Sequence, residues 1–165
     1  MEIIHQHRPK GIFITNPHNP TGYYVKRSDF EGLLAASQNS LVVLDEAYIT
    51  SVDNAWSSLD MIGSGNLLIL RSMTKDFALA GLRLGYGMAA GNIISTLRRA
   101  QPPWSINAVA QRAGSMVLKE EAYVTECQTK MREAKEYLVA ELSRLGLPPL
   151  PSAASFFLVK VGNAA

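Results

Sequence analysis

A lysine flanked by hydroxyl residues and followed by an arginine is the strongest chemical signal in this sequence. Lys75 comes shortly after Ser72 and Thr74, and Arg83 lies eight positions further on. A lysine amine can condense with an aldehyde, while hydroxyls and a guanidinium can bind phosphate oxygens. The spacing therefore predicts a Schiff-base lysine beside a phosphate-binding site.

Two more motifs precede this run: Asn16-Pro17-His18-Asn19-Pro20-Thr21-Gly22 and Asp45-Glu46-Ala47-Tyr48. Together with the run from Ser72 to Tyr86, and in this order, they resemble the cofactor site of the fold-type I aminotransferases, class I/II. The resemblance implies pyridoxal 5'-phosphate as cofactor, an amino acid or a phosphorylated amine as small-molecule substrate, and a homodimer for the intact enzyme.

The resemblance also implies a role for each matching residue. Lys75 would bind the cofactor covalently and then act as general acid and base at the substrate Cα. Asp45 would keep the pyridine nitrogen protonated, which makes the ring an electron sink. Tyr48 and Asn19 would bind the phenolic oxygen of the cofactor, and Asn19 would also contact the substrate. The matching phosphate ligands are Ser72, Thr74 and Arg83.

The same residues have simpler explanations. An aspartate after a strand can cap a helix or close a turn, so Asp45 could be structural. Asn-Pro-Thr-Gly is good turn chemistry without any ligand, which would account for Asn19. Lys75 taken alone could be an exposed loop lysine. The combination of Lys75 with Asp45 and Arg83 favours the cofactor site.

Short apolar runs predict the strands that would position these residues. Gly11–Thr15 leads into the Asn-Pro motif, Leu41–Leu44 ends at Asp45, and Asn66–Leu70 ends at Arg71 and Ser72. In parallel sheets, ligands gather beyond the carboxyl ends of the strands. The predicted edge would present Asn19, Asp45 and Ser72.

Strands alternating with helices predict an α/β fold, with a largely parallel sheet covered on both faces. We expect a helix from Asp29 to Ser37 capped by Ser28, and a further strand from Arg83 to Ala89. This fold would be the pyridoxal-phosphate-dependent transferase fold type I, with a partial large domain.

The second part of the sequence turns helical. Apolar residues at helical spacing predict helices over Ser105–Leu118 and Glu120–Leu145, the second ended by Gly146. Ser155–Val161 predicts one more strand. We expect residues 1–118 to form part of the large cofactor-binding domain. Residues 119–165 would form a long connecting helix and the start of the small α+β domain.

Composition excludes several function classes. The 165 residues carry a net charge of +2, which is too small to indicate a nucleic-acid partner. No apolar run reaches the ~20 residues of a membrane helix, and the N-terminus lacks a signal-peptide core. The single Cys127 excludes an internal disulfide and a cysteine metal cluster. We expect no membrane partner, no metal, and a cytoplasmic location.

The charges are unevenly distributed. The segment from Phe77 to Lys119 contains no acidic residue, and its basic residues are Arg83, Arg98, Arg99, Arg112 and Lys119. A positive field there would suit a phosphorylated cofactor or an anionic substrate. A solvated basic helix face is the alternative for Arg98 and Arg99.

Two segments resemble different members of the family. Gln101–Asn107, which reads Gln-Pro-Pro-Trp-Ser-Ile-Asn, resembles threonine-phosphate decarboxylase of cobalamin biosynthesis, whereas Phe77–Arg83 is as similar to the histidinol-phosphate aminotransferases. Trp104 is a candidate substrate contact, with packing under a helix start as the alternative. Ser152-x-x-Ser155-Phe156 departs from the usual Ala-Asn-Phe of the family. We expect transaminase-like chemistry, with decarboxylation as the alternative.

The resemblance covers essentially the whole chain but only a central-to-late portion of the full family length. We therefore expect a partial enzyme, and a catalytically inactive α/β fragment is the alternative from another class.

One competing motif, Gly85–Ala90, fits the dinucleotide fingerprint G-x-G-x-x-A. That fingerprint requires an acidic residue about 20 positions later, and none occurs before Lys119. The dehydrogenase interpretation is excluded on this ground.

Overall fold

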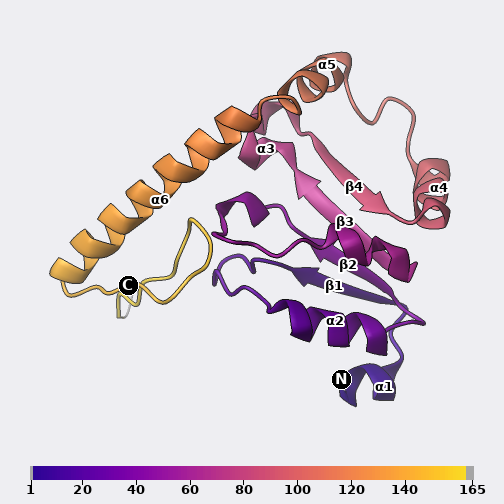
Figure 1. The fold of residues 1–165 in the computed structure, drawn as a ribbon, viewed down its shortest axis with the longest axis horizontal. Helices are drawn as coiled ribbons and strands as arrows, with labels where there is room; N and C mark the ends of the chain where they lie inside the picture. The colour runs from indigo at the N-terminus through magenta and orange to yellow at the C-terminus, as the bar shows by residue number, and fades with distance from the viewer. Residues whose placement is uncertain (1, 163–165) are drawn as a thin grey trace.

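A four-stranded sheet forms the centre of the computed structural model, which describes residues 2–162 (Figure 1). The strands, in spatial order, are β1 (Gly11–Thr15), β2 (Leu41–Asp45), β3 (Leu67–Ser72) and β4 (Gly85–Ala89). The first three run parallel, and β4 runs antiparallel to β3. The prediction of an α/β fold with a largely parallel sheet is confirmed, and β4 adds an antiparallel edge.

One face of the sheet packs against α2 (Arg27–Ala36). Phe30 and Leu34 of this helix are buried against β2 and β3, because alternate residues of each strand point to the same face. The core on this side consists of Phe30, Leu34, Val42, Leu44, Met61, Leu67 and Ile69. Trp56 closes the cluster, with its ring 5.5 Å from that of Phe30.

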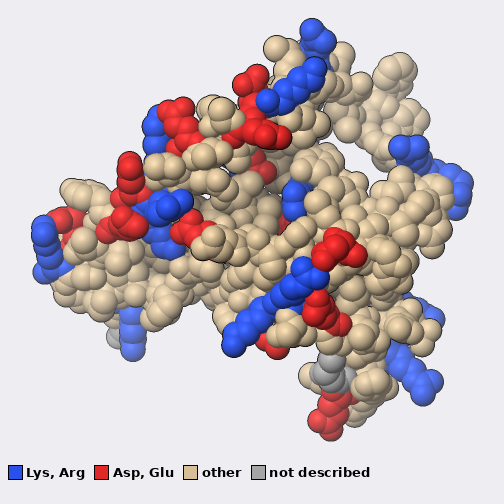
Figure 2. Space-filling view, viewed as in Figure 1, with Lys and Arg blue, Asp and Glu red and all other residues tan. Residues whose placement is uncertain are grey.

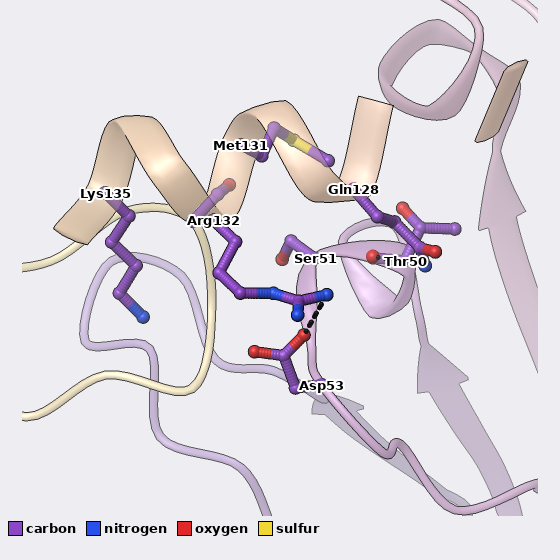
Figure 3. A pocket seen from close by; sticks show the side chains of 8 residues that line it. Thr50, Ser51, Asp53, Gln128, Met131, Arg132 and Lys135 are labelled. Atoms are coloured by element: carbon purple, nitrogen blue, oxygen red, sulfur yellow. Dashed lines mark hydrogen bonds and ion pairs between the residues drawn. The ribbon is translucent and has the colours of Figure 1, made fainter. Parts of the chain in front are cut away.

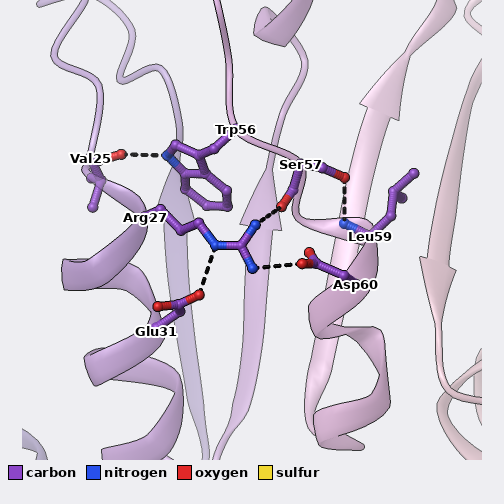
Figure 4. Close-up of polar contacts among 7 residues, drawn as sticks. All are labelled: Val25, Arg27, Glu31, Trp56, Ser57, Leu59 and Asp60. Atoms are coloured by element: carbon purple, nitrogen blue, oxygen red, sulfur yellow. Dashed lines mark hydrogen bonds and ion pairs between the residues drawn. The ribbon is translucent and has the colours of Figure 1, made fainter.

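The start of α2 is held by Arg27 rather than by the predicted Ser28 cap. The helix begins at Arg27, and its N-cap residue Lys26 makes no side-chain cap hydrogen bond. The Arg27 guanidinium donates to Glu31 at 2.7 Å and to Asp60 at 2.6 Å, across to η2 (Leu59–Ser64) (Figure 4). Ser28 therefore lies inside the first turn, and the prediction of its capping role was wrong.

The opposite face of the sheet is only partly covered. Phe13 of β1 points to this side and remains 61% exposed, so the expected covering of both faces is incomplete. Next to β4 a second small core joins Met73, Leu84 and Ala110. These residues come from α3 (Met73–Asp76), from the turn after η3 (Ala80–Leu82), and from α5 (Ala108–Val117).

The helices α1 (Glu2–His7), α4 (Gly91–Ala100) and α6 (Glu121–Arg144) lie at the periphery (Figure 1). The short helix η1 (Ile49–Ser51) follows β2 and contacts α6, and its Ile49 is buried. Within residues 2–162, each helix is either too short or too polar to cross a membrane. No group of three or more potential metal ligands occurs in the same described range.

The predicted helices of the second part formed with shorter bounds. α5 starts after Asn107, whose side-chain oxygen accepts a hydrogen bond from Ala110 N at 2.8 Å. α6 ends before Gly146, which adopts a φ of 75° and so stops the helix as predicted.

The predicted strand Ser155–Val161 was wrong. The segment forms only an isolated bridge between Pro149 and Val159, with Leu150 N donating to Leu158 O at 2.8 Å. Pro148, Pro149 and Pro151 lack backbone donors, so they cannot supply the ladder that a strand needs. An apolar run favours an extended backbone. A β-strand also requires a neighbouring strand to pair with, and the run itself does not supply one.

Candidate functional site

The carboxyl ends of the three parallel strands lie at one edge of the sheet, as the sequence predicted. Asp45 pairs with Thr15 on one side and with Leu70 on the other. The backbone ladder continues one step beyond the strands, because Asn16 N donates to Asp45 O at 2.9 Å and Glu46 N donates to Leu70 O at 2.8 Å. This edge therefore holds the loops that carry the candidate residues.

The structure brings Lys75 and Tyr48 together. Lys75 is exposed on the short helix α3, and its Nζ lies 5.3 Å from the centroid of the Tyr48 ring. An ammonium over an aromatic face is stabilised by about 0.5–1 kcal/mol at exposed sites. The Tyr48 ring in turn packs edge-on against Phe156 with centroids 5.0 Å apart. Within residues 2–162 the Lys75 amine has no hydrogen-bond partner, so it is available for chemistry.

Ser72 and Thr74 form a hydroxyl pair beside this lysine. Their Oγ and Oγ1 atoms are 2.6 Å apart, and either can act as the donor. Thr74 is buried to 9% exposure, whereas Ser72 is partly exposed at the end of β3. Two adjacent hydroxyls can both donate to phosphate oxygens when an anion replaces their mutual hydrogen bond.

Asp45 serves a turn and also retains one free oxygen. Its Oδ1 accepts a hydrogen bond from Ala47 N at 2.9 Å, which is the turn role that the sequence left open. Its second carboxylate oxygen has no hydrogen-bond partner among residues 2–162. A carboxylate can accept through both oxygens, so the turn bond and a protonated ring nitrogen can be satisfied together.

Three predicted site residues lie away from these contacts or have other partners. Arg83 is exposed with a φ of 52°, and its Nη1 donates to the carbonyl oxygen of Ala80 at 3.0 Å. Asn19 is exposed, and the turn around it is held by His18 Nδ1 and Thr21 Oγ1 at 2.8 Å. Trp104 is 97% exposed, so the alternative of packing under a helix start is wrong.

The structural role of Asn16 was not predicted from the sequence, where this residue was only part of the Asn-Pro motif. Its side chain is fully buried, and its Oδ1 accepts from Val25 N at 2.8 Å. Its Nδ2 is buried without a partner in the described part of the chain. A buried amide donor without an acceptor costs about 1–3 kcal/mol, so this atom marks an unsatisfied polar position beside the strand ends. The position of Asn16 directly after a buried strand was the signal available in the sequence.

A separate pocket lies between η1 and α6 (Figure 3). Gln128 of α6 donates to Thr50 O at 2.9 Å, and Arg132 forms an ion pair with Asp53 at 3.3 Å. None of the predicted site residues lines it. Thr50 nevertheless links it to the lysine helix, because its hydroxyl donates to Asp76 Oδ1 at 2.6 Å.

Asp76, the neighbour of Lys75, makes the stability of the protein depend on pH. Burial raises the pKa of its carboxyl above the ordinary 3.8, and this effect outweighs the hydrogen bond from Thr50 and the charge of Arg71, which lower it. The folded state therefore binds the proton more tightly than the unfolded state does. The free energy of unfolding from this group falls as the pH rises from 3.8 through the raised value.

Asp76→Asn is expected to remove this dependence. Near pH 7 the variant should be more stable than the wild type, within the ~1 kcal/mol typical of single substitutions, because it buries no charge. The difference should shrink as the pH falls toward 3.8. Urea unfolding at a series of pH values measures this, and a variant that is less stable near pH 7 would contradict it.

The sequence matches the aminotransferase class I and II family over residues 2–165. Histidinol-phosphate aminotransferase of Moorella thermoacetica is 39% identical over 159 residues, which are 93% of this chain and 41% of that protein. The enzyme of the same name from Thermoanaerobacter pseudethanolicus is 36% identical and is covered to 46%, with 99% of this chain aligned. The chain thus spans less than half the length of these relatives.

Solved structures resemble the fold over nearly the whole chain. Histidinol-phosphate aminotransferase of Clostridium acetobutylicum superposes with a TM-score of 0.88 at 29% identity, covering 98% of this chain and 51% of that one. L-threonine-O-3-phosphate decarboxylase of Porphyromonas gingivalis superposes with a TM-score of 0.84 at 27% identity, covering 94% of this chain and 48% of that one. Histidinol-phosphate aminotransferase of Sinorhizobium meliloti, solved with pyridoxal-5'-phosphate, superposes with a TM-score of 0.91 at 24% identity, covering 98% of this chain and 45% of that one. At this identity the likeness supports the fold alone.

The family match extends over nearly every residue, and the three motifs lie at the strand ends where the sheet gathers them. The fold is accordingly that of the pyridoxal-phosphate-dependent transferases of fold type I. This chain belongs to the aminotransferase class I and II family.

Proposed function

We propose that this chain is the cofactor-binding part of a pyridoxal-phosphate-dependent aminotransferase, with Lys75 as the residue that binds the cofactor covalently. The observation that carries the proposal is the position of Lys75. Its amine lies over the Tyr48 ring, and in the sequence it directly follows the hydroxyl pair of Ser72 and Thr74. Family membership supports the same cofactor chemistry.

The side chains at the strand ends fit this cofactor in kind. Lys75 offers an amine for the aldehyde, Asp45 a carboxylate oxygen for the ring nitrogen, and Ser72 with Thr74 two hydroxyls for the phosphate. Tyr48 and Asn19 would bind the phenolic oxygen. Arg83 would be a further phosphate ligand; its Nη1 donates to the carbonyl oxygen of Ala80, and its guanidinium has further N–H donors. Trp104 and Asn19 are proposed substrate contacts.

When bound, the cofactor supplies an electron sink for the bonds at the Cα of an amino substrate. Asp45 holds the proton at the ring nitrogen, since an adjacent carboxylate stabilises the positive form. Lys75 Nζ removes the proton at the substrate Cα and returns protons during amino transfer. The Tyr48 face beside Nζ restricts where that amine can lie, and Phe156 fixes the Tyr48 ring.

For the substrate we propose a phosphorylated amine, with histidinol phosphate as the first compound to test, because the relatives at 36–39% identity carry that activity in their names. Arg98 and Arg99 at the end of α4 favour an anionic ligand. Figure 2 shows basic side chains without acidic neighbours where Figure 1 places α4, while both charges alternate along α6.

Decarboxylation of threonine phosphate is the second candidate reaction. The Gln101–Asn107 segment favours it, and the decarboxylase of Porphyromonas gingivalis shares the fold with a TM-score of 0.84. The two reactions differ in which bond at Cα is broken. Carbon dioxide release from phosphothreonine and amino transfer from histidinol phosphate therefore distinguish them.

The domain assignment and the assembly are also proposals. We propose that residues 1–118 belong to the large domain and that residues 119–165 form the connecting helix and the start of the small domain. Met1 and residues 163–165 lie outside the range that the structure describes. α6, with none of its residues buried, suits a connecting helix. A homodimeric intact enzyme and a cytoplasmic location complete the proposal, and light scattering and cell fractionation test them.

Adding pyridoxal phosphate and reducing with borohydride is expected to label Lys75. Peptide mapping by mass spectrometry should find one reduced pyridoxyl phosphate per chain, on the peptide that contains Lys75, because the hydroxyls of Ser72 and Thr74 can hold the phosphate next to this exposed amine. Lys130, which is exposed and paired with Glu126 at 2.5 Å, serves as the internal control. Equal labelling of both lysines, or no labelling, would support the alternative of an inactive fragment.

A further inference from the structure

Glu46 is a buried carboxylate that the proposed chemistry does not use. Its side chain is 1% exposed, and it immediately follows Asp45. A buried ion without partners costs several kcal/mol, so its surroundings must compensate for the charge. Glu46 lies on the same side of the sheet as the buried Val42 and Leu44 of β2, which are four and two residues before it.

Arg71 and Ser58 satisfy both oxygens of this carboxylate. Nε and Nη2 of Arg71 each lie 2.9 Å from Oε2, and the hydroxyl of Ser58 donates to Oε1 at 2.6 Å. Burial lowers the pKa of the Arg71 guanidinium, but the charges and hydrogen bonds of Glu46 and Tyr86 together raise it, so its pKa lies above the usual value. Both carboxylate oxygens of Glu46 therefore accept hydrogen bonds.

This ion pair connects the end of β2 with the end of β3, the two strands that carry the residues proposed to bind the ring and the phosphate of the cofactor. Glu46 follows Asp45, and Arg71 precedes Ser72. Because side chains alternate along a strand, Glu46 and Arg71 point to the α2 side while Asp45 and Ser72 point to the other face. Arg71 is also paired in register with Tyr86 of β4.

We propose that the ion pair between the buried Glu46 and the partly buried Arg71, with Ser58 bound to the second oxygen of Glu46, is a positioning element that fixes the separation of the ring-binding Asp45 and the phosphate-binding Ser72. The inference rests on the proposed function. An apolar pair of similar volume would often be as stable as a buried ion pair, so stability alone does not account for these residues. The ion pair adds a fixed geometry at the two backbone positions where the cofactor would be held at both ends.

The test compares pyridoxal phosphate with pyridoxal, which lacks the phosphate. Pyridoxal uses only the ring-side anchors, whereas pyridoxal phosphate uses both ends of the site. Glu46→Gln and Arg71→Lys should weaken pyridoxal phosphate binding on the order of 10- to 100-fold and pyridoxal binding much less, because misplaced groups lose this much at a preorganised site. Binding is measured by equilibrium titration of each aldehyde with the 165-residue chain.

A triple variant separates position from stability. Glu46→Leu with Arg71→Met and Ser58→Ala removes both charges together with the buried hydroxyl that would otherwise lose its acceptor, so it is expected to fold with an unfolding midpoint close to that of the wild type. It should still lose the preference for pyridoxal phosphate. Glu31→Gln, in the exposed pair with Arg27, is the matched control and should keep that preference.

The outcomes are distinct. A selective loss for pyridoxal phosphate in a folded variant supports the positioning role. An equal loss for both aldehydes, or none, overturns it while the proposed function stands. If the wild type itself forms no adduct at Lys75, the proposed function fails, and the positioning role fails with it.

Discussion

Lys75→Arg is expected to abolish the borohydride-trapped cofactor adduct. Arginine keeps the positive charge over the Tyr48 ring, but its guanidinium stays protonated and does not condense with an aldehyde. The loss should be complete, and any turnover that the chain supports should fall by at least ~10²-fold, since both the covalent link and the general base are removed. Mass spectrometry of the reduced protein measures the adduct.

Two controls make this result specific to the site. Lys130→Arg changes a comparable exposed lysine and should leave the adduct unchanged. The free energy of unfolding of Lys75→Arg should stay within about 0.5 kcal/mol of the wild type, because the side chain is exposed and the cation over the ring is retained. A trapped adduct of wild-type amount in Lys75→Arg would show that another amine binds the cofactor.

The parallel strands could be predicted because their signal is local. Gly11–Thr15 formed with the predicted bounds, and the run before Asp45 formed β2, since continuous apolar residues between polar loops suit a buried strand. The run at Ser155–Val161 had the same pattern and failed, because a strand also needs a partner edge. The segment opposite it contains Pro148, Pro149 and Pro151, which have no backbone N–H to donate to such a ladder. Local sequence therefore predicted the elements better than their pairing.

The site was predictable by residue type but only partly by contact. The order of motifs placed Asp45 and Ser72 at one sheet edge, and the structure agrees. The distance of Lys75 from Tyr48 depends on how α3 folds back from β3, which no local pattern reports. Arg83 was expected near the phosphate-binding hydroxyls, but its side chain bonds the η3 turn.

Glu46 shows a signal that was present in the sequence and passed over. A glutamate beside a motif is usually a surface residue, because its charge is costly to bury. Its position, two residues after Leu44 in an alternating strand, places it on the buried side. Arg71 has the same relation to Ile69 in β3. Opposite charges at matching positions of neighbouring strands are a pattern by which sequence alone can suggest a buried ion pair.

Asp45→Asn tests the assignment that distinguishes a cofactor site from a turn. The asparagine oxygen can still accept the hydrogen bond from Ala47 N, so the turn and the fold should persist. The amide cannot hold a proton on a ring nitrogen as a carboxylate does. We therefore expect the adduct at Lys75 to form while substrate α-proton exchange falls ~10²–10⁴-fold, the range for losing a positioned proton-transfer group. Proton NMR in deuterated water measures this exchange.

Asp45→Ala separates the two roles of this carboxylate. It removes the turn acceptor as well, so it should lose an additional ~0.5–1.5 kcal/mol of folding free energy relative to Asp45→Asn, the usual contribution of one hydrogen bond. Both variants should lose the exchange activity equally, because neither carries a negative charge next to the ring. If Asp45→Asn exchanges the α-proton as fast as the wild type, and only Asp45→Ala is impaired, the carboxylate serves the turn and the ring nitrogen must be held by a different residue.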